Sequence, residues 1–108
     1  MTKGDIWFVE LPEGKGHEQK GSRPGIICSR ANGLSVVIPL TTNRSCSNLQ
    51  CTHVIEPTKE NGLSDDSVAL VFQITSVDKS RFIRKMGKIS DEEGKNIDDV
   101  LKTMLKLG

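Results

Sequence analysis

The chain has 108 residues, of which 27% are charged and 35% are hydrophobic, and its formal net charge is +1. This size predicts one compact domain, spanning residues 1–108, rather than two. With a total charge so close to zero, the protein as a whole cannot attract nucleic acid electrostatically. A nucleic-acid site would therefore have to be a local basic patch.

The first half of the chain predicts a strand, a long loop and a hairpin. Residues 6–11 mix apolar and acidic side chains as a strand does, and the proline that follows ends it. Residues 13–22 are rich in glycine and charge and form a loop that is long for so small a domain, which is typical of functional loops. Residues 25–29 and 34–40 are apolar and β-branched, and the Asn-Gly dipeptide between them favours a type I′ hairpin turn.

The second half predicts a polar loop and three further strands. Residues 41–49 are expected to form the loop, which leads to a strand at residues 52–55. Residues 67–74 favour a single strand, and residues 82–86 favour a short one. The two faces of the strand at 67–74 would carry Val68, Leu70 and Phe72 on one side, and Ala69, Val71 and Gln73 on the other.

A helix is predicted near the end of the chain. Ser90-Asp91-Glu92-Glu93 has the Ser-x-x-Glu pattern of a capping box, so the helix should begin there, with Gly108 as its C-cap. Its apolar residues repeat at spacings of three and four and form one stripe, made of Ile97, Val100, Leu101, Met104 and Leu105. Five or six short strands and one amphipathic helix predict a mainly β (α+β) fold, a small, partly closed antiparallel barrel with the helix packed against it.

The cysteines favour neither disulfides nor a metal site. Cys28, Cys46 and Cys51 are an odd number in a chain that looks cytosolic, where thiols stay reduced. Together with His53 they could surround zinc, but the spacing lacks the short Cys-x2–4-Cys knuckle of such sites. We therefore expect no bound metal.

The sequence also bears on location. Residues 1–9 lack the charged region, apolar stretch and cleavage site of a secretion signal. No apolar run approaches the roughly 20 residues that span a bilayer. We therefore expect a cytoplasmic protein with no membrane segment.

The densest candidate for chemistry is the segment 16–24, which gathers the imidazole of His17, the carboxylate of Glu18 and the guanidinium of Arg23 in a glycine-bounded loop. A guanidinium presents a planar set of donors suited to phosphate oxygens, but it is a poor general base. His17 and Glu18 are therefore the candidate bases, and neighbouring residues of an extended segment point to opposite sides. Glu18 could instead hold Arg23 in place through an ion pair.

Several ordered segments resemble the signature segments of MazF/PemK toxins, and the resemblance runs from about residue 4 to the terminal helix. They are Gly4-Asp5-Ile6-Trp7, His17-Glu18-Gln19-x-Gly21-x-Arg23-Pro24, Ile38-Pro39-Leu40-Thr41-Thr42, and Asp66-Ser67-Val68 with Gln73-Ile74-x-Ser76-Val77-Asp78-Lys79-x-Arg81. Such motifs in the right order are far more specific than any one of them alone.

The resemblance implies a homodimer of SH3-like barrels that cleaves single-stranded RNA at a short sequence. The reaction would leave a 2′,3′-cyclic phosphate and a 5′-hydroxyl, and it would need no metal and no other cofactor. The implied partners are the RNA and a cognate antitoxin protein, which in such systems is a partly disordered, acidic segment.

The resemblance also assigns site residues. The family's catalytic arginine falls on Arg23 and its catalytic threonine on Thr41, with Thr42 as the alternative if the register is shifted by one. His17 and Glu18 remain competing candidates for proton transfer, and His17 stands where other members of the family carry serine. The residues implied to contact substrate are Gln19, Ser22, Thr42 and Gln73.

Two other functions fit the same kind of barrel. A non-enzymatic toxin of the CcdB type would bind and trap DNA gyrase through its C-terminal helix and would need no Arg–Thr pair. An inactive RNA-binding barrel would keep its affinity for RNA without cleaving it.

Overall fold

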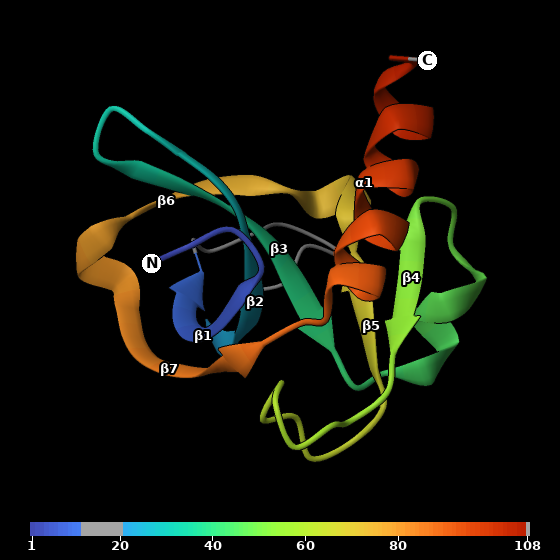
Figure 1. Cartoon of the computed structure of the whole chain (residues 1–108), viewed down its shortest axis with the longest axis horizontal. Helices are drawn as coiled ribbons and strands as arrows, with labels where there is room; N and C mark the ends of the chain where they lie inside the picture. Colours follow the sequence, from blue (N-terminus) through green and yellow to red (C-terminus); the bar gives the residue numbers. More distant parts are fainter. Residues whose placement is uncertain (12–20, 108) are drawn as a thin grey trace.

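The computed structural model of the chain describes residues 1–11 and 21–107, so the greater part of the predicted loop at residues 13–22, with His17, Glu18 and Gln19, lies outside the described residues. Figure 1 shows the arrangement of the described elements. In chain order they are β1 (Asp5–Leu11), β2 (Gly21–Ala31), β3 (Leu34–Thr41), the 3-10 helix η1 (Arg44–Asn48), β4 (Thr52–Ile55), β5 (Ser67–Leu70), the 3-10 helix η2 (Val71–Gln73), β6 (Thr75–Asp78), the 3-10 helix η3 (Lys79–Arg81), β7 (Phe82–Lys88) and α1 (Asp91–Leu105).

The strands form one antiparallel sheet in the order β4-β5-β3-β2-β1-β7, and β6 pairs with β3 beside β5. Strand β3 pairs with β2 along one edge. Its other edge pairs first with β6 and then, from Leu40 onwards, with β5. The sheet curls without closing, and Figure 1 shows α1 beside β4 and β5. The prediction of a mainly β fold with a partly closed antiparallel sheet and a C-terminal helix is confirmed.

The hairpin between β2 and β3 turns where the sequence predicts it. Asn32 and Gly33 have φ angles of 54° and 79°, and positive values at both central residues define a type I′ turn. Ala31 and Leu34 are paired on either side of the turn. The local dipeptide thus fixes the register next to the turn, and an irregularity between Ile27 and Ser29 shifts the pairing by one residue further along the two strands.

Strand β2 begins at Gly21, four residues earlier than predicted. Its first residues pair with β1, from Gly21 opposite Leu11 to Ile26 opposite Ile6. Long-range pairing therefore extends β2 into the segment that the sequence predicts to be a loop.

The prediction of a single strand over residues 67–74 is wrong. Strand β5 ends at Leu70, and η2 separates it from β6. If the register of β5 on β3, with Leu40 opposite Ala69, were continued, Phe72 would lie opposite Val37, but Thr75 lies there instead. The two registers differ by three positions, and the three residues of η2 account for this difference. Phe72 therefore does not lie on the predicted face of a strand, and it is 41% exposed.

Two apolar clusters form the core. The larger one packs α1 against the sheet, and it includes Ile6, Ile26, Ile38, Leu40, Ile55 and Ile97, with Val100, Leu101 and Met104 at its border. The smaller one contains Val9, Leu11, Val37 and Val77, with Phe82 beside it. The predicted stripe of the helix is confirmed except at Leu105, which is 56% exposed. No helix in the described part of the chain is long and apolar enough to cross a membrane.

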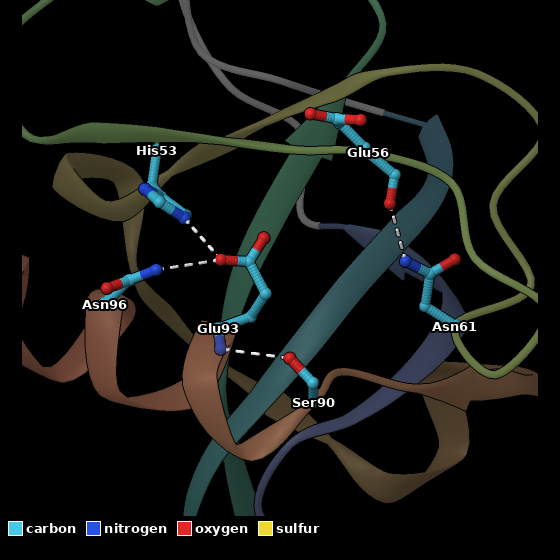
Figure 2. A network of polar contacts seen from close by, with 6 residues as sticks. All are labelled: His53, Glu56, Asn61, Ser90, Glu93 and Asn96. Carbon is cyan, nitrogen blue, oxygen red and sulfur yellow. Dashed lines mark hydrogen bonds and ion pairs between the residues drawn. The ribbon is translucent and has the colours of Figure 1, made fainter.

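The start of α1 is capped as predicted and is also tied to the sheet. The Ser90 side chain accepts a hydrogen bond from the Glu93 backbone N–H at 3.1 Å. A full capping box also requires the Glu93 carboxylate to reach back to the Ser90 backbone N–H. Here the carboxylate does not do so. Its Oε1 lies 2.9 Å from His53 Nε2 on β4 and accepts a hydrogen bond from Asn96 Nδ2 at 3.0 Å (Figure 2).

These contacts change the acidity of Glu93. Burial by itself favours the neutral acid, but the hydrogen bonds from His53 and Asn96 outweigh it and lower the pKa of Glu93 below its ordinary value of 4.5. The ionised carboxylate is therefore the form that fastens α1 to β4.

We expect Glu93→Gln to lower the free energy of unfolding at neutral pH by about 1 kcal/mol, because it removes a charged acceptor from a half-exposed contact. Since folding lowers the pKa of Glu93, the stabilisation is present above its ordinary pKa and is lost as pH falls through the lower folded value. Urea unfolding at several pH values should show the gap between wild type and variant closing below pH 4.5. Glu92→Gln is the matched control, because Glu92 is exposed in the same helical turn. Equal pH dependence of the two variants would contradict the role of the Glu93 contacts.

Candidate functional site

The two predicted catalytic residues lie at the same end of the β2–β3 pair. Gly25 pairs with Pro39. Arg23 lies two residues beyond that pair on β2, and Thr41 lies two residues beyond it on β3. Both side chains therefore belong to the end of the hairpin that is opposite its turn.

The neighbourhood of Arg23 holds hydrogen-bond donors that lack acceptors. Arg23 is half-buried, and its Nε–H is buried without an acceptor in the described part of the structure, as is the Nε1–H of Trp7. Arg23 pairs with Val9 and Trp7 pairs with Gly25, so Arg23 and Trp7 are diagonal neighbours on one face of β1–β2. Buried donors without acceptors are costly, so this face suits an acceptor-rich ligand.

Gly25 allows close packing beneath this face. A Cβ at Gly25 would lie 2.5 Å from Val37 Cγ1 and 3.3 Å from Val9 Cγ1. Both valines are fully buried in the smaller cluster. The strand that carries Arg23 is therefore held by a rigid apolar contact two residues away.

Thr41 is oriented by the backbone that follows it. It is buried, and its Oγ1 accepts a hydrogen bond from the Asn43 N–H at 3.2 Å. A hydroxyl that accepts through its oxygen can still donate its hydrogen. Thr41 is thus prepared to give a hydrogen bond to a ligand.

The segment after Thr41 is itself held in place. Asn43 Oδ1 accepts hydrogen bonds from the Ser45 N–H at 3.1 Å and the Ser45 hydroxyl at 2.6 Å, which caps η1. Arg44 Nη1 lies 2.7 Å from Asp66 Oδ2, linking η1 to the residues before β5. This predicted loop is an ordered platform for Thr41.

The other predicted substrate-contacting residues fall in different places. Ser22 is exposed on β2 opposite Glu10, and Thr42 is exposed next to Thr41. Gln73 is half-buried in η2. Thr42 and Ser22 are chain neighbours of Thr41 and Arg23, and on the extended strand β2 Ser22 points to the other face of the sheet from Arg23.

A hollow of about 710 Å³ adjoins the Thr41 segment, and we call it the Phe72 hollow. It is lined by Asn43, Ser45, Cys46, Leu49, Gln50, Cys51, Leu70, Phe72 and Gln73. Sequence reasoning assigned Gln73 to substrate contact but missed Phe72 and Gln50. The sequence did offer a signal, because the aromatic Phe72 directly precedes Gln73. The predicted strand, however, placed Phe72 and Gln73 on opposite faces.

A larger hollow, of about 810 Å³, lies between residues 54–61 and the start of α1. Its lining includes Glu93 and Asn61, and Asn61 Nδ2 donates to the Glu56 carbonyl at 2.9 Å (Figure 2). Neither Arg23 nor Thr41 lines it. Two of its lining residues, Ser90 and Glu93, belong to the capped and tied start of α1.

The thiol of Cys28 does not offer a nucleophile. Burial raises the pKa of Cys28 to about 12, against an opposing effect of Lys3, so its thiol stays protonated. Cys46 and Cys51 are half-buried free thiols in the Phe72 hollow. In residues 1–11 and 21–107, no three His, Cys, Asp or Glu side chains gather as a metal site.

Comparison with known proteins identifies the relatives of the chain. The model of the family described as PemK-like, MazF-like toxin of type II toxin-antitoxin system matches residues 2–105. The endoribonuclease MazF9 of Mycobacterium tuberculosis (strain ATCC 25618 / H37Rv) is 32% identical over 117 residues, which cover 99% of this chain and 98% of the relative.

Solved structures show the same fold. The crystal structure of MazF (Form-I) from Deinococcus radiodurans superposes with a TM-score of 0.77 at 23% identity, covering 96% of this chain and 94% of that one. A mycobacterial endoribonuclease in complex with its cognate antitoxin gives a TM-score of 0.75 at 21% identity, covering 98% and 95%. Since the family model spans nearly all of the sequence, this chain belongs to the PemK-like, MazF-like toxins of type II toxin–antitoxin systems.

Proposed function

We propose that this chain is an endoribonuclease that cleaves single-stranded RNA at a short sequence, without a metal. Family membership and the full-length similarity to an endoribonuclease support this function. The observation that carries it is the placement of Arg23 and Thr41 at one end of the β2–β3 pair. There a cationic donor and a free hydroxyl hydrogen can meet one phosphate.

In the proposed reaction, the 2′-oxygen attacks the adjacent phosphorus and the bond from phosphorus to the 5′-oxygen breaks. The products are a 2′,3′-cyclic phosphate and a 5′-hydroxyl. Negative charge grows on the non-bridging oxygens in the transition state. Arg23 and Thr41 donate hydrogen bonds to those oxygens, and removal of one such donor typically costs about 3 kcal/mol of transition-state stabilisation.

Two protons must move in this reaction. A base removes the proton of the 2′-hydroxyl, and an acid supplies a proton to the departing 5′-oxygen. Arg23 is unsuited to be the base because a guanidinium keeps its protons in proteins. His17 and Glu18 are the proposed groups for these transfers, and Glu18 is alternatively a positioning residue for Arg23.

The proposed partners follow from the relatives. Solved structures include a MazE–MazF complex from Deinococcus radiodurans and the mycobacterial complex with its antitoxin. We propose that this chain also binds a cognate antitoxin, forms a homodimer and acts in the cytoplasm. Gln19, Ser22, Thr42 and Gln73 are the proposed substrate contacts.

The similarities do not favour the rival function of a gyrase-trapping toxin. The family model and the relative with 32% identity belong to MazF toxins. A gyrase poison would produce DNA breaks in the presence of gyrase and leave RNA intact.

We expect Arg23→Ala to reduce the rate of RNA cleavage by about 100-fold or more, because it removes a charged donor from the transition state. The rate is measured on a long single-stranded RNA in the presence of EDTA. Arg30→Ala is the matched control, since Arg30 is exposed on the same strand near the hairpin turn. Loss of activity in both variants to the same degree, or in neither, would show that Arg23 has no special role.

Thr41→Val removes the hydroxyl but keeps the shape of the side chain. We expect it to lower kcat by about 100-fold with little change in KM, as for a donor that acts mainly in the transition state. Thr42→Val tests the register. Because Thr42 is a proposed substrate contact, we expect this variant to raise KM but to retain near-normal kcat. A larger loss in Thr42→Val than in Thr41→Val would reassign the threonine.

A further inference from the structure

The Phe72 hollow is continuous with the segment that positions Thr41. Asn43 is one of the residues that line the hollow, and its backbone N–H donates to the Thr41 hydroxyl. Thr41 is not itself among the lining residues, but the residue that orients its hydroxyl is.

Phe72 is an exposed aromatic ring on a fixed backbone. Its N–H donates to the Cys51 carbonyl at 3.2 Å, which joins η2 to the segment before β4. The ring is 41% exposed, and Leu49 across the same hollow is 50% exposed. A flat, exposed ring backed by apolar atoms is a platform on which a nucleobase can stack.

The polar groups around the ring are uncharged amides. Asn43 uses its Oδ1 to cap η1, whereas its Nδ2 has no hydrogen-bond partner in the described part of the structure. Gln50 is exposed on the rim, and Gln73 also contributes to the lining. Amides offer donors and acceptors that match the edges of bases.

The charge of the lining discriminates between parts of a nucleotide. None of the described residues that line the hollow is Asp, Glu, Lys or Arg. A phosphate would need cationic donors, which stand at Arg23 instead. The hollow therefore suits the neutral base of a nucleotide.

We propose that the Phe72 hollow binds one base of the RNA next to the scissile phosphate, with Phe72 as the stacking ring and Gln50 as a specificity-determining contact. This inference rests on the proposed endoribonuclease function and deepens it. It assigns part of the sequence preference to residues that the sequence motifs did not identify.

The test compares Phe72→Leu, which keeps an apolar side chain, with Phe72→Tyr, which keeps the ring. Stacking on an aromatic ring contributes enough that its loss costs about tenfold or more in binding. We expect Phe72→Leu to lower kcat/KM by at least about tenfold on an RNA that wild type cleaves, and Phe72→Tyr, which keeps the ring, to lose clearly less than Phe72→Leu. We also expect Gln50→Ala to broaden the base accepted at one position beside the cut, mapped on a randomised RNA pool.

Binding without cleavage gives a second readout. An RNA with a 2′-deoxy sugar at the cut and 2-aminopurine at the preferred position should lose fluorescence on wild type and on Phe72→Tyr, but much less on Phe72→Leu. Circular dichroism and sedimentation velocity check that each variant is folded and has the wild-type oligomeric state. If Phe72→Leu does not fold, Gln50→Ala and Phe72→Tyr carry the test.

Several outcomes would overturn the inference. In the first, wild type cleaves RNA, and Phe72→Leu and Gln50→Ala both cleave it with the same rate and base preference as wild type. Another is loss of activity in Phe72→Leu together with dissociation into monomers, which would mean that a second copy of the chain covers the hollow. If wild type cleaves no RNA, the proposed function itself fails, and this result is distinct from the other two.

Discussion

Strand β3 is hydrogen-bonded along both edges, and the positions of the other strands depend on that pairing. On one edge the Asn-Gly turn, together with the one-residue shift between Ile27 and Ser29, sets its register with β2. On the other edge β6 and β5 share its length, with three residues of η2 between their registers. The first pairing brings Arg23 and Thr41 to one end of the hairpin, and the second turns Phe72 out of the core. The candidate catalytic residues and the adjacent hollow thus follow from the same strand.

The two polar centres of the molecule differ in how completely their groups are paired. Glu93 accepts from both Asn96 and His53, and its pKa is lowered as in a structural ion pair. Arg23, by contrast, has a buried Nε–H without an acceptor in residues 1–11 and 21–107. Satisfied polar groups stabilise a fold, whereas unsatisfied donors favour a ligand. This contrast supports the proposal that the chemistry occurs at Arg23 rather than in the larger hollow beside Glu93.

Features set by local interactions could be predicted from the sequence. The Asn32-Gly33 turn and the Ser90 cap depend on residues within three positions, and both are where the patterns place them. The break at η2 could not be predicted, because it depends on the offset between two distant partners of β3. The partner of Glu93 is His53, 40 residues away. Arg23 was identified through motif order, but its place on β2 depends on pairing with β1.

The central claim is that the 2′-oxygen of the RNA is the nucleophile and that Arg23 and Thr41 stabilise the resulting transition state. The most direct measurement is mass spectrometry of the products from two matched oligonucleotides in EDTA, an RNA and the same RNA with one 2′-deoxy sugar at the cut. The account predicts a 2′,3′-cyclic phosphate and a 5′-hydroxyl from the first, and no cleavage of the second. Cleavage of the deoxy-substituted strand at the same position, or products with a 5′-phosphate, would contradict it.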